Sequence, residues 1–282
     1  MNIFITGEHG YIGGHLEDAL TAAGHRCARI SLRGGAADLN GLGEADAIIH
    51  CAALVHSRED DPGRFYRINT ELTAELAEKA KKEGVRLFVF MSTMAVYGVS
   101  DSLKGITVIG ANTPLNPVTF YGKSKLAAEQ KLQEMADRRF RVYILRLPMV
   151  YGAGAPGNYG RLCRLVRLTP VFPQVANKRS MIGIGHLQNY MRKLLENDMP
   201  DELDNTPYTR IFYPQDPAPV CTSDLAAGIA AGLGKKLILS PALGRLVLLL
   251  PAGPVRKLFG SLVYADSLTG LEYNPGPPTY PV

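Results

Sequence analysis

The chain has 282 residues, of which 46% are hydrophobic and 20% are charged. This composition provides enough apolar side chains for a packed core and excludes a wholly disordered chain. The formal net charge of +5 permits an anionic ligand, but it is too small and too dispersed to predict nucleic-acid binding.

The four cysteines lie far apart and form no Cys-x-x-Cys pair. This spacing argues against a disulfide framework and favours a reduced, cytoplasmic protein. We expect no signal peptide, because the first residues contain neither a basic segment nor a cleavage site. The six histidines and the cysteines show no metal-ligand spacing, so no metal site is expected.

The most apolar stretch of the chain is 237–250. It is interrupted by Pro241, Gly244 and Arg245, and it is shorter than the roughly 20 residues that a membrane span needs. We therefore expect no membrane span and interpret this stretch as a buried helix and loop. The alternative is a weak attachment of the stretch to a membrane surface.

Short apolar runs alternate with helical patterns through the first half of the chain. The apolar runs predict strands at 3–6, 26–30, 47–51, 87–91 and 141–147. The helical patterns predict helices at 12–23, 65–83 and 119–137. Because the strands are apolar without alternation, they indicate an α/β fold whose parallel sheet is covered on both faces.

The sequence changes character after about residue 150, where glycine and proline become frequent and the helical patterns become shorter. We predict an α/β domain over 1–152 and a smaller, loop-rich lobe over 153–282. Some return of the chain from the lobe to the first domain is expected.

A glycine-rich segment joins the first predicted strand to the first predicted helix, with Gly7, Gly10 and Gly13 at a spacing of three. Glycine is needed where a phosphate approaches the backbone, and the following helix N-terminus offers free N–H groups. This context predicts a dinucleotide site. The same spacing within 154–160 is interrupted by Pro156, and we interpret it as a plain loop.

The residues after the second predicted strand bear on which dinucleotide binds. Ser31 and Arg33 follow this strand, with no carboxylate between them. An acidic residue there would bind the ribose hydroxyls of NAD, whereas a basic one favours the 2′-phosphate of NADP. The pair therefore favours NADP, the alternative being a solvated arginine. Asp38 and Leu39 lie where a carboxylate can accept from the adenine amino group, and a simple turn is the alternative.

Tyr121 and Lys125 are four residues apart and share one face of the predicted helix 119–137. A free phenol has a pKa of about 10, which is too high for a base at neutral pH. An ammonium group about 5 Å away is expected to lower that pKa by about two units, making Tyr121 a candidate acid and base. Thr93, just after the strand 87–91, is expected to hydrogen-bond the reacting oxygen. The alternative is an incidental pair on a surface helix.

Three motifs in this order resemble the extended short-chain dehydrogenase/reductases. They are Thr6-Gly7-x-x-Gly10-x-x-Gly13, Ser92-Thr93-x-x-Val96-Tyr97-Gly98 and Tyr121-x-x-x-Lys125. The segments 146–152 and 50–53 and the residue Asn69 also match. The chain is most similar to nucleotide-sugar epimerases and reductases related to UDP-hexose 4-epimerase. This resemblance implies a Rossmann-type doubly wound parallel sheet with a smaller C-terminal substrate-binding lobe.

The resemblance also implies roles for individual residues. Tyr121 would be the acid and base, Lys125 its electrostatic partner and a ribose ligand, and Thr93 the hydroxyl on the sugar oxygen, with Ser92 as the alternative. Asn158 and Arg179 would hold the diphosphate of the substrate. The cofactor would contact Gly7, Gly10, Tyr11, Ile12, Gly13, Ala52, Ala53 and Pro148.

Met94 and Ala95 stand where the 4,6-dehydratases of this family carry an acidic pair, so dehydration is not expected. The resemblance implies an NAD(P)-dependent epimerase acting at C4 of a nucleotide sugar, with an NADPH-dependent 4-keto-sugar reductase as the alternative. A non-catalytic dinucleotide-binding sensor or scaffold is an alternative of another class. A homodimer is the expectation from the family, and no nucleic-acid partner is expected.

Overall fold

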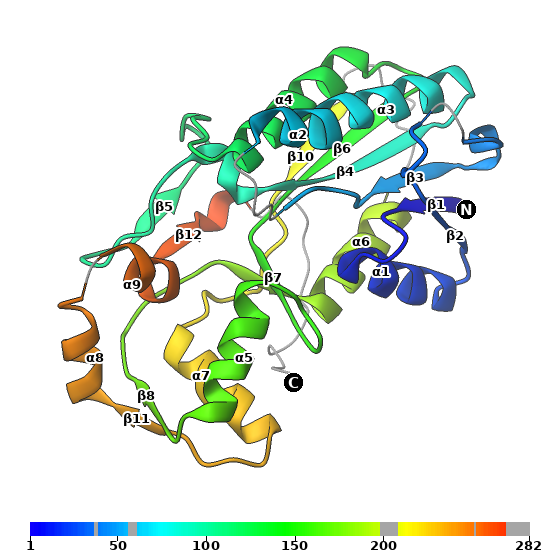
Figure 1. Cartoon of the computed structure of the whole chain (residues 1–282). Coiled ribbons are helices and arrows are strands. Elements are labelled where there is room, and N and C mark those ends of the chain that lie inside the picture. Colours follow the sequence, from blue (N-terminus) through cyan, green and yellow to red (C-terminus); the bar gives the residue numbers. More distant parts are fainter. Residues whose placement is uncertain (37–38, 56–60, 198–207, 251, 269–282) are drawn as a thin grey trace. The chain divides into compact units, whose positions relative to one another are not determined.

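A computed structural model of the chain describes residues 1–36, 39–55, 61–197, 208–250 and 252–268 (Figure 1). The chain divides into two compact units, and each unit is assembled from segments that are distant in the sequence. The first unit contains Met1–Gly98, Pro114–Leu147 and Gln188–Tyr213, and the second contains Val99–Thr113, Pro148–Leu187 and Pro214–Val282.

A six-stranded sheet forms the centre of the first unit, in the order β10-β6-β4-β3-β1-β2. Its neighbouring strands are all parallel, which confirms the predicted α/β fold class. The strands are β1 (Asn2–Thr6), β2 (Arg26–Ile30), β3 (Ala47–His50), β4 (Leu87–Thr93), β6 (Arg141–Leu147) and β10 (Thr209–Phe212).

Helices cover both faces of this sheet (Figure 1). The helices α1 (Tyr11–Ala22) and α6 (Ile184–Glu196) lie on one face, and α2 (Pro62–Tyr66), α3 (Leu72–Lys82) and α4 (Phe120–Met135) lie on the other. Leu76 of α3 and Leu132 of α4 pack in one cluster with Phe88 and Phe90 of β4. Because the sheet is covered on both sides, β4 is a continuous apolar run rather than an alternating one.

The pattern predicted as one helix over 65–83 is a continuous helical run with a wider turn in its middle. Asp61 begins the run, and its side chain accepts a hydrogen bond from the Gly63 amide at 2.9 Å. After α2 comes a π-helical turn, Arg67–Glu71, and α3 follows directly. Such turns occur frequently at functional sites, and this one carries the buried side chain of Asn69.

Short parallel strand pairs and short helices make up the second unit. The strand pairs are β5 (Thr107–Ile109) with β12 (Leu262–Tyr264), β7 (Met149–Tyr151) with β9 (Met181–Gly183), and β8 (Val171–Pro173) with β11 (Ile238–Ser240). The helices are α5 (Asn158–Leu168), α7 (Thr222–Gly232), α8 (Pro241–Val247) and α9 (Ala252–Phe259). The ammonium group of Lys235 binds the carbonyls of Val166, Arg167 and Thr169 and so caps the C-terminus of α5.

The interpretation of 237–250 as a buried helix and loop is wrong. This stretch forms β11, α8 and a following turn, and its large apolar side chains are mostly exposed. The helix packs through Gly244, where an added Cβ would lie 2.1 Å from the carbonyl oxygen of Gln174. Gly244 therefore allows a close backbone contact of α8, while Leu246, Leu248, Leu249 and Leu250 are exposed.

Candidate active site

The glycine loop joins β1 to α1 in the first unit. Gly7 has a φ of +88° and lies against the backbone of Ala52, where an added Cβ would come within 3.4 Å. Gly10 is the N-cap of α1, no described side chain caps the helix, and no acidic residue lies in its first turn. The amides of Tyr11, Ile12 and Gly13 therefore begin a helix whose N-terminus suits an anion. The loop thus fits the diphosphate of a dinucleotide.

Arg29 of β2 supports this loop from the side of the neighbouring strand. Its guanidinium donates to the carbonyl oxygen of Gly7 and, at 3.4 Å, to that of Gly10. An added Cβ on Gly13 would lie 3.3 Å from this guanidinium, so glycine leaves the space that Arg29 fills. Glu17 lies 3.7 Å away as an ion-pair partner. Arg29 was not among the site residues predicted from the sequence, although an arginine inside a predicted strand was a visible signal.

A chain of hydrogen bonds fixes the backbone that follows β3. Thr6 Oγ1 accepts from the amides of Cys51 and Ala52 at 3.1 and 3.0 Å and bonds His50 Nδ1 at 2.9 Å. Thr73 donates to a backbone carbonyl and therefore accepts from His50 Nε2 at 2.9 Å. This pattern assigns a neutral His50 protonated on Nε2. Burial and the nearby Lys125 lower the pKa of His50 to about 3, which agrees with a neutral ring.

Thr93 and Tyr121 lie side by side at the carboxyl end of β4, where the Thr93 hydroxyl acts to lower the pKa of the phenol. Thr119 caps α4 by accepting from the Gly122 amide at 3.0 Å. At Gly122 an added Cβ would lie 2.7 Å from the carbonyl oxygen of Ala95. Only glycine permits this approach of α4 to the turn after β4. The sequence therefore brings Tyr121 to Thr93 through one small residue.

Lys125 is buried one turn further along α4. Its Nζ donates to the carbonyl oxygen of Met91 at 2.7 Å and lies 4.3 Å from the centre of the Phe90 ring. Burial lowers the pKa of Lys125 to about 7, although Cys51 and Glu129 act in the opposite direction.

The predicted lowering of the Tyr121 pKa by Lys125 is absent from this structure. Burial raises the pKa of Tyr121 to about 12, and the hydrogen bond with Thr93 opposes this rise. The ammonium group of Lys125 is directed at the end of β4, where it binds a carbonyl. At neutral pH the phenol is therefore protonated in the chain alone.

Asn69 connects the loop after β3 to the start of α4. Its amide group accepts from the Leu54 amide at 2.7 Å and donates to the Leu54 carbonyl at 2.9 Å. It also donates to the Ser124 hydroxyl at 3.0 Å, and Ser124 in turn donates to the carbonyl of Tyr121. The π-helical turn thus holds the backbone on both sides of the candidate site.

A buried ion pair lies behind Lys125. Arg146 of β6 donates to Glu129 of α4 at 2.7 Å and to the Tyr97 hydroxyl at 2.8 Å. The Ser92 hydroxyl donates to the same carboxylate of Glu129. Ser92 is therefore committed to this network, and Thr93 is the hydroxyl of the two that faces Tyr121.

The remaining cofactor candidates differ in their surroundings. Arg33 is exposed, while Leu39 and Ala52 pack against the core cluster. Ala53 follows Ala52 in the loop after β3, and Pro148 directly follows β6. Asp38 lies outside the described residues.

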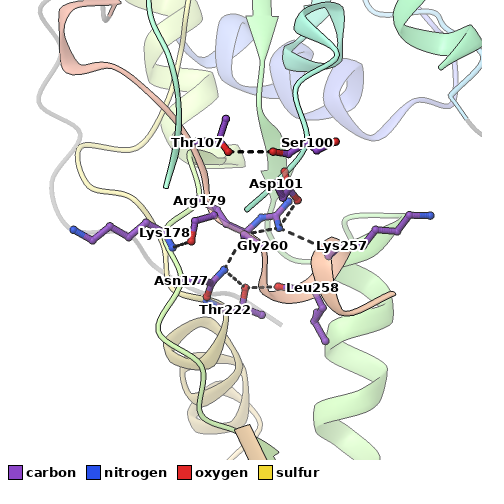
Figure 2. Close-up of polar contacts among 11 residues, drawn as sticks. Ser100, Asp101, Thr107, Asn177, Lys178, Arg179, Thr222, Lys257, Leu258 and Gly260 are labelled. Carbon is purple, nitrogen blue, oxygen red and sulfur yellow. Dashed lines mark hydrogen bonds and ion pairs between the residues drawn. The ribbon is translucent and has the colours of Figure 1, made fainter. Parts of the chain in front are cut away.

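The two diphosphate candidates lie in the second unit. Asn158 is exposed at the first position of α5. Arg179 forms an ion pair with Asp101 at 2.9 Å and donates to the carbonyls of Gly260 at 3.1 Å and Lys257 at 3.3 Å (Figure 2). All three contacts are made by Nη1 of Arg179, so this nitrogen is engaged within the second unit.

Residues of the segment 182–186 belong to a buried polar cluster in the second unit. The carboxylate of Asp216 lies 2.6 Å from His186 Nδ1, and it accepts from the Tyr151 hydroxyl at 2.7 Å and from the Gly183 amide at 3.0 Å. These contacts join the start of α6 to β7.

Known proteins are similar to this chain in sequence and in fold. UDP-glucose 4-epimerase from Vibrio cholerae is 29% identical over 301 residues, covering 95% of this chain and 85% of that protein. An N-acetyl-alpha-D-glucosaminyl-diphospho-ditrans,octacis-undecaprenol 4-epimerase from Escherichia coli O157:H7 is 25% identical, covering 70% of this chain and 63% of that protein. The structure of MoeE5 in complex with UDP-glucuronic acid and NAD superposes with a TM-score of 0.70 at 21% identity, covering 98% of this chain and 95% of that chain.

The family model described as the NAD dependent epimerase/dehydratase family matches residues 3–168, more than half of the chain. This match includes the glycine loop, Thr93, Tyr121 and Lys125. The chain therefore belongs to the NAD dependent epimerase/dehydratase family.

Proposed function

We propose that the chain is an NAD(P)-dependent epimerase acting at C4 of a nucleotide-linked hexose, with a UDP-hexose as the first candidate substrate. The observation that carries this proposal is the close approach of α4 at Gly122 to the turn after β4, which places Tyr121 beside Thr93. Ligands of open parallel sheets bind beyond the carboxyl ends of the strands, and the glycine loop lies at the same end of β1. The Vibrio cholerae relative named UDP-glucose 4-epimerase supports the choice of substrate.

In this mechanism a bound NAD(P) supplies the acceptor for the hydrogen of C4. Tyr121 takes the proton of the 4-hydroxyl as that hydrogen leaves, and it returns the proton when the 4-keto sugar is reduced on its other face. Thr93 holds the sugar oxygen against Tyr121 by a hydrogen bond. Gly7, Gly10 and the first amides of α1 hold the diphosphate of the cofactor.

The two halves of this reaction need different protonation states of Tyr121. Reduction of the 4-keto sugar needs the protonated phenol, which is the form expected at neutral pH when the pKa is about 12. Oxidation of the alcohol needs the phenolate, so its rate should rise with pH while Tyr121 remains mostly protonated. An ammonium group has three donors, and Lys125 uses one on Met91, so it can also bind a ribose hydroxyl.

A 4-keto-sugar reductase is the second candidate function. It is favoured by the basic residues Arg29 and Arg33 and by Ser31, which stands after β2 in place of a carboxylate. These residues suit the 2′-phosphate of NADP, and a reductase would consume NADPH.

The experiment is incubation of the full chain with UDP-, dTDP- and GDP-hexoses and their 4-keto derivatives, with products followed by NMR. Reduced nicotinamide is followed by absorbance. An epimerase interconverts two hexoses without net consumption of NADPH, whereas a reductase consumes one NADPH for each 4-keto sugar. If no hexose changes and no NADPH is consumed, both proposals fail.

A further inference from the structure

The second unit carries a row of exposed leucines at the end of α8. Leu246, Leu248, Leu249 and Leu250, here called the leucine tip, have exposed fractions of 59%, 40%, 83% and 54%. Consecutive exposed leucines are unusual on a soluble surface and usually mark a binding site. Helix α8 is attached to its unit through Gly244, which packs against Gln174, while Leu246 and the three leucines that follow the helix are exposed.

The strands beside α8 add further exposed apolar side chains. Val171 of β8 and Ile238 of β11 are register partners and both are exposed. Leu168, at the end of α5, has an exposed fraction of 81%. The bond from the Ile238 amide to the Pro170 carbonyl, at 2.9 Å, holds these segments together. These residues are further exposed apolar side chains of the same unit.

The charges around this surface all have one sign along two long stretches. The stretch 233–260 contains no aspartate or glutamate, and its basic residues are Lys235, Lys236, Arg245, Arg256 and Lys257. Helix α5 also lacks acidic residues and carries Arg161, Arg164 and Arg167. Arg245 is exposed and precedes Leu246 directly. Within the helices α5, α7, α8 and α9, the acidic residue is Asp224 at the start of α7.

We propose that the leucine tip is a docking surface for an anionic lipid bilayer. The leucines enter the boundary between headgroups and acyl chains, while Arg245 and its basic neighbours bind lipid phosphates. In the part of the chain that the structure describes, no helix is long and apolar enough to cross a membrane, so the contact is peripheral. The cationic surroundings argue against a second copy as the occupant, because a symmetric contact would bring like charges together.

The test is co-sedimentation of the full chain with vesicles of phosphatidylcholine, with and without phosphatidylglycerol. We expect binding to the anionic vesicles that weakens as salt is added. The double variant L246S/L249S should lower the partition coefficient about a hundredfold, or about tenfold for each leucine. The variant R245Q should lower it about fivefold.

The matched control is Val118→Ser, because Val118 is an exposed apolar residue of the first unit with an exposed fraction of 71%. It should leave vesicle binding unchanged. All variants should keep the parent melting curve, since these side chains are exposed, and should keep the parent turnover of a soluble UDP-hexose. Vesicle binding therefore tests the docking proposal, and turnover of the UDP-hexose independently tests the proposed function.

Three outcomes would overturn the docking proposal. The parent chain binds neither kind of vesicle, or L246S/L249S binds the anionic vesicles as well as the parent and V118S do. Alternatively, sedimentation equilibrium without lipid could show that L246S/L249S converts a dimer into a monomer, in which case the leucine tip is an interface between copies.

Discussion

In the first unit, β1 and β4 end in threonines beside the glycine loop and the start of α4, whereas in the second unit the arginine predicted to bind the diphosphate is held by residues of its own unit. In the first unit, Thr6 and Arg29 hold backbone groups around Gly7, whose backbone lies against Ala52. In the second unit, Arg179 is bound to Asp101 and to two carbonyls (Figure 2). The backbone of the loop can accept a ligand directly, whereas one nitrogen of Arg179 is held by Asp101 and two carbonyls.

Two buried charged sites within the first unit also differ in how well their charges are compensated. Arg146 and Glu129 in the first unit satisfy each other and have further hydroxyl partners. Lys125 lies one helical turn from Glu129 but binds a neutral carbonyl, and its pKa falls to about 7. The candidate active site thus keeps an incompletely compensated cation, as expected where a ligand completes the site.

The largest expected effect comes from Tyr121→Phe. We expect turnover to fall about 100- to 10,000-fold, because the ring stays while the group that moves the proton is lost. Initial rates measured by NMR check this, and titration with NAD(P)H should show unchanged cofactor binding. The control is Tyr208→Phe, at an exposed tyrosine of the same unit. Equal rates for parent and Y121F would favour the non-catalytic sensor.

The second prediction concerns Lys125 and pH. The pKa of Lys125 is about 7 in the folded chain and near its ordinary value of 10.5 when unfolded. Between these values the unfolded chain binds the extra proton, so this lysine makes stability rise with pH; below about pH 7 its destabilising effect is constant. Lys125→Met should therefore be more stable than the parent at pH 7, by about 1–3 kcal/mol after the lost bond to Met91 is subtracted.

Urea unfolding at several pH values checks this prediction, with the exposed Lys123→Met as the control. The advantage of K125M should shrink as the pH approaches 10.5, the ordinary lysine value. A difference between K125M and parent that did not change with pH would mean that the ammonium group is fully compensated in the folded chain.

The third prediction concerns Arg29→Met and tests whether Arg29 supports the binding of the cofactor by the glycine loop. Loss of two bonds to loop carbonyls should raise the dissociation constant of NADPH about tenfold. NADH should lose less, if the guanidinium also attracts the 2′-phosphate. Fluorescence titration measures both constants, and Arg26→Met, on the same strand but bonded to Asn2, is the control. If R29M binds both nucleotides like the parent, Arg29 has no part in cofactor binding.

The smallest expected effect is that of Asp101→Asn. If Arg179 holds the substrate diphosphate, removal of its acidic partner should lower KM for the nucleotide sugar about two- to fivefold while kcat stays the same. Steady-state kinetics checks this, with the exposed Asp224→Asn as the control. An unchanged KM together with a lower melting temperature would assign Arg179 to the stability of the second unit.

Much of the first unit follows from local sequence pattern. The strands 26–30 and 141–147 have the predicted bounds, and β4 extends only two residues beyond its prediction to include Thr93. The helix after β1 is also where the glycine spacing predicts it. These features depend on hydrophobic periodicity and on glycine, both of which are local.

The remaining features depend on contacts between distant residues. Neither the bond of Lys125 to Met91 nor the position of Arg29 beneath the loop follows from spacing along one element. The exposure of the leucine tip could not be predicted from local sequence either, because an apolar segment has the same hydrophobic pattern whether its side chains are buried or exposed. The contact of Gly244 with Gln174 joins residues that are distant in the sequence, so the local pattern could not predict it.

In the proposed reaction a bound NAD(P) would take up the hydrogen of C4 and return it to the same carbon, while Tyr121 transfers the proton of the hydroxyl group. The direct test is to incubate a UDP-hexose deuterated at C4 in ordinary water with the chain, and to examine the product by NMR. We predict that the epimer forms with deuterium retained at C4. An epimer whose C4 label had been replaced by solvent hydrogen would contradict the account.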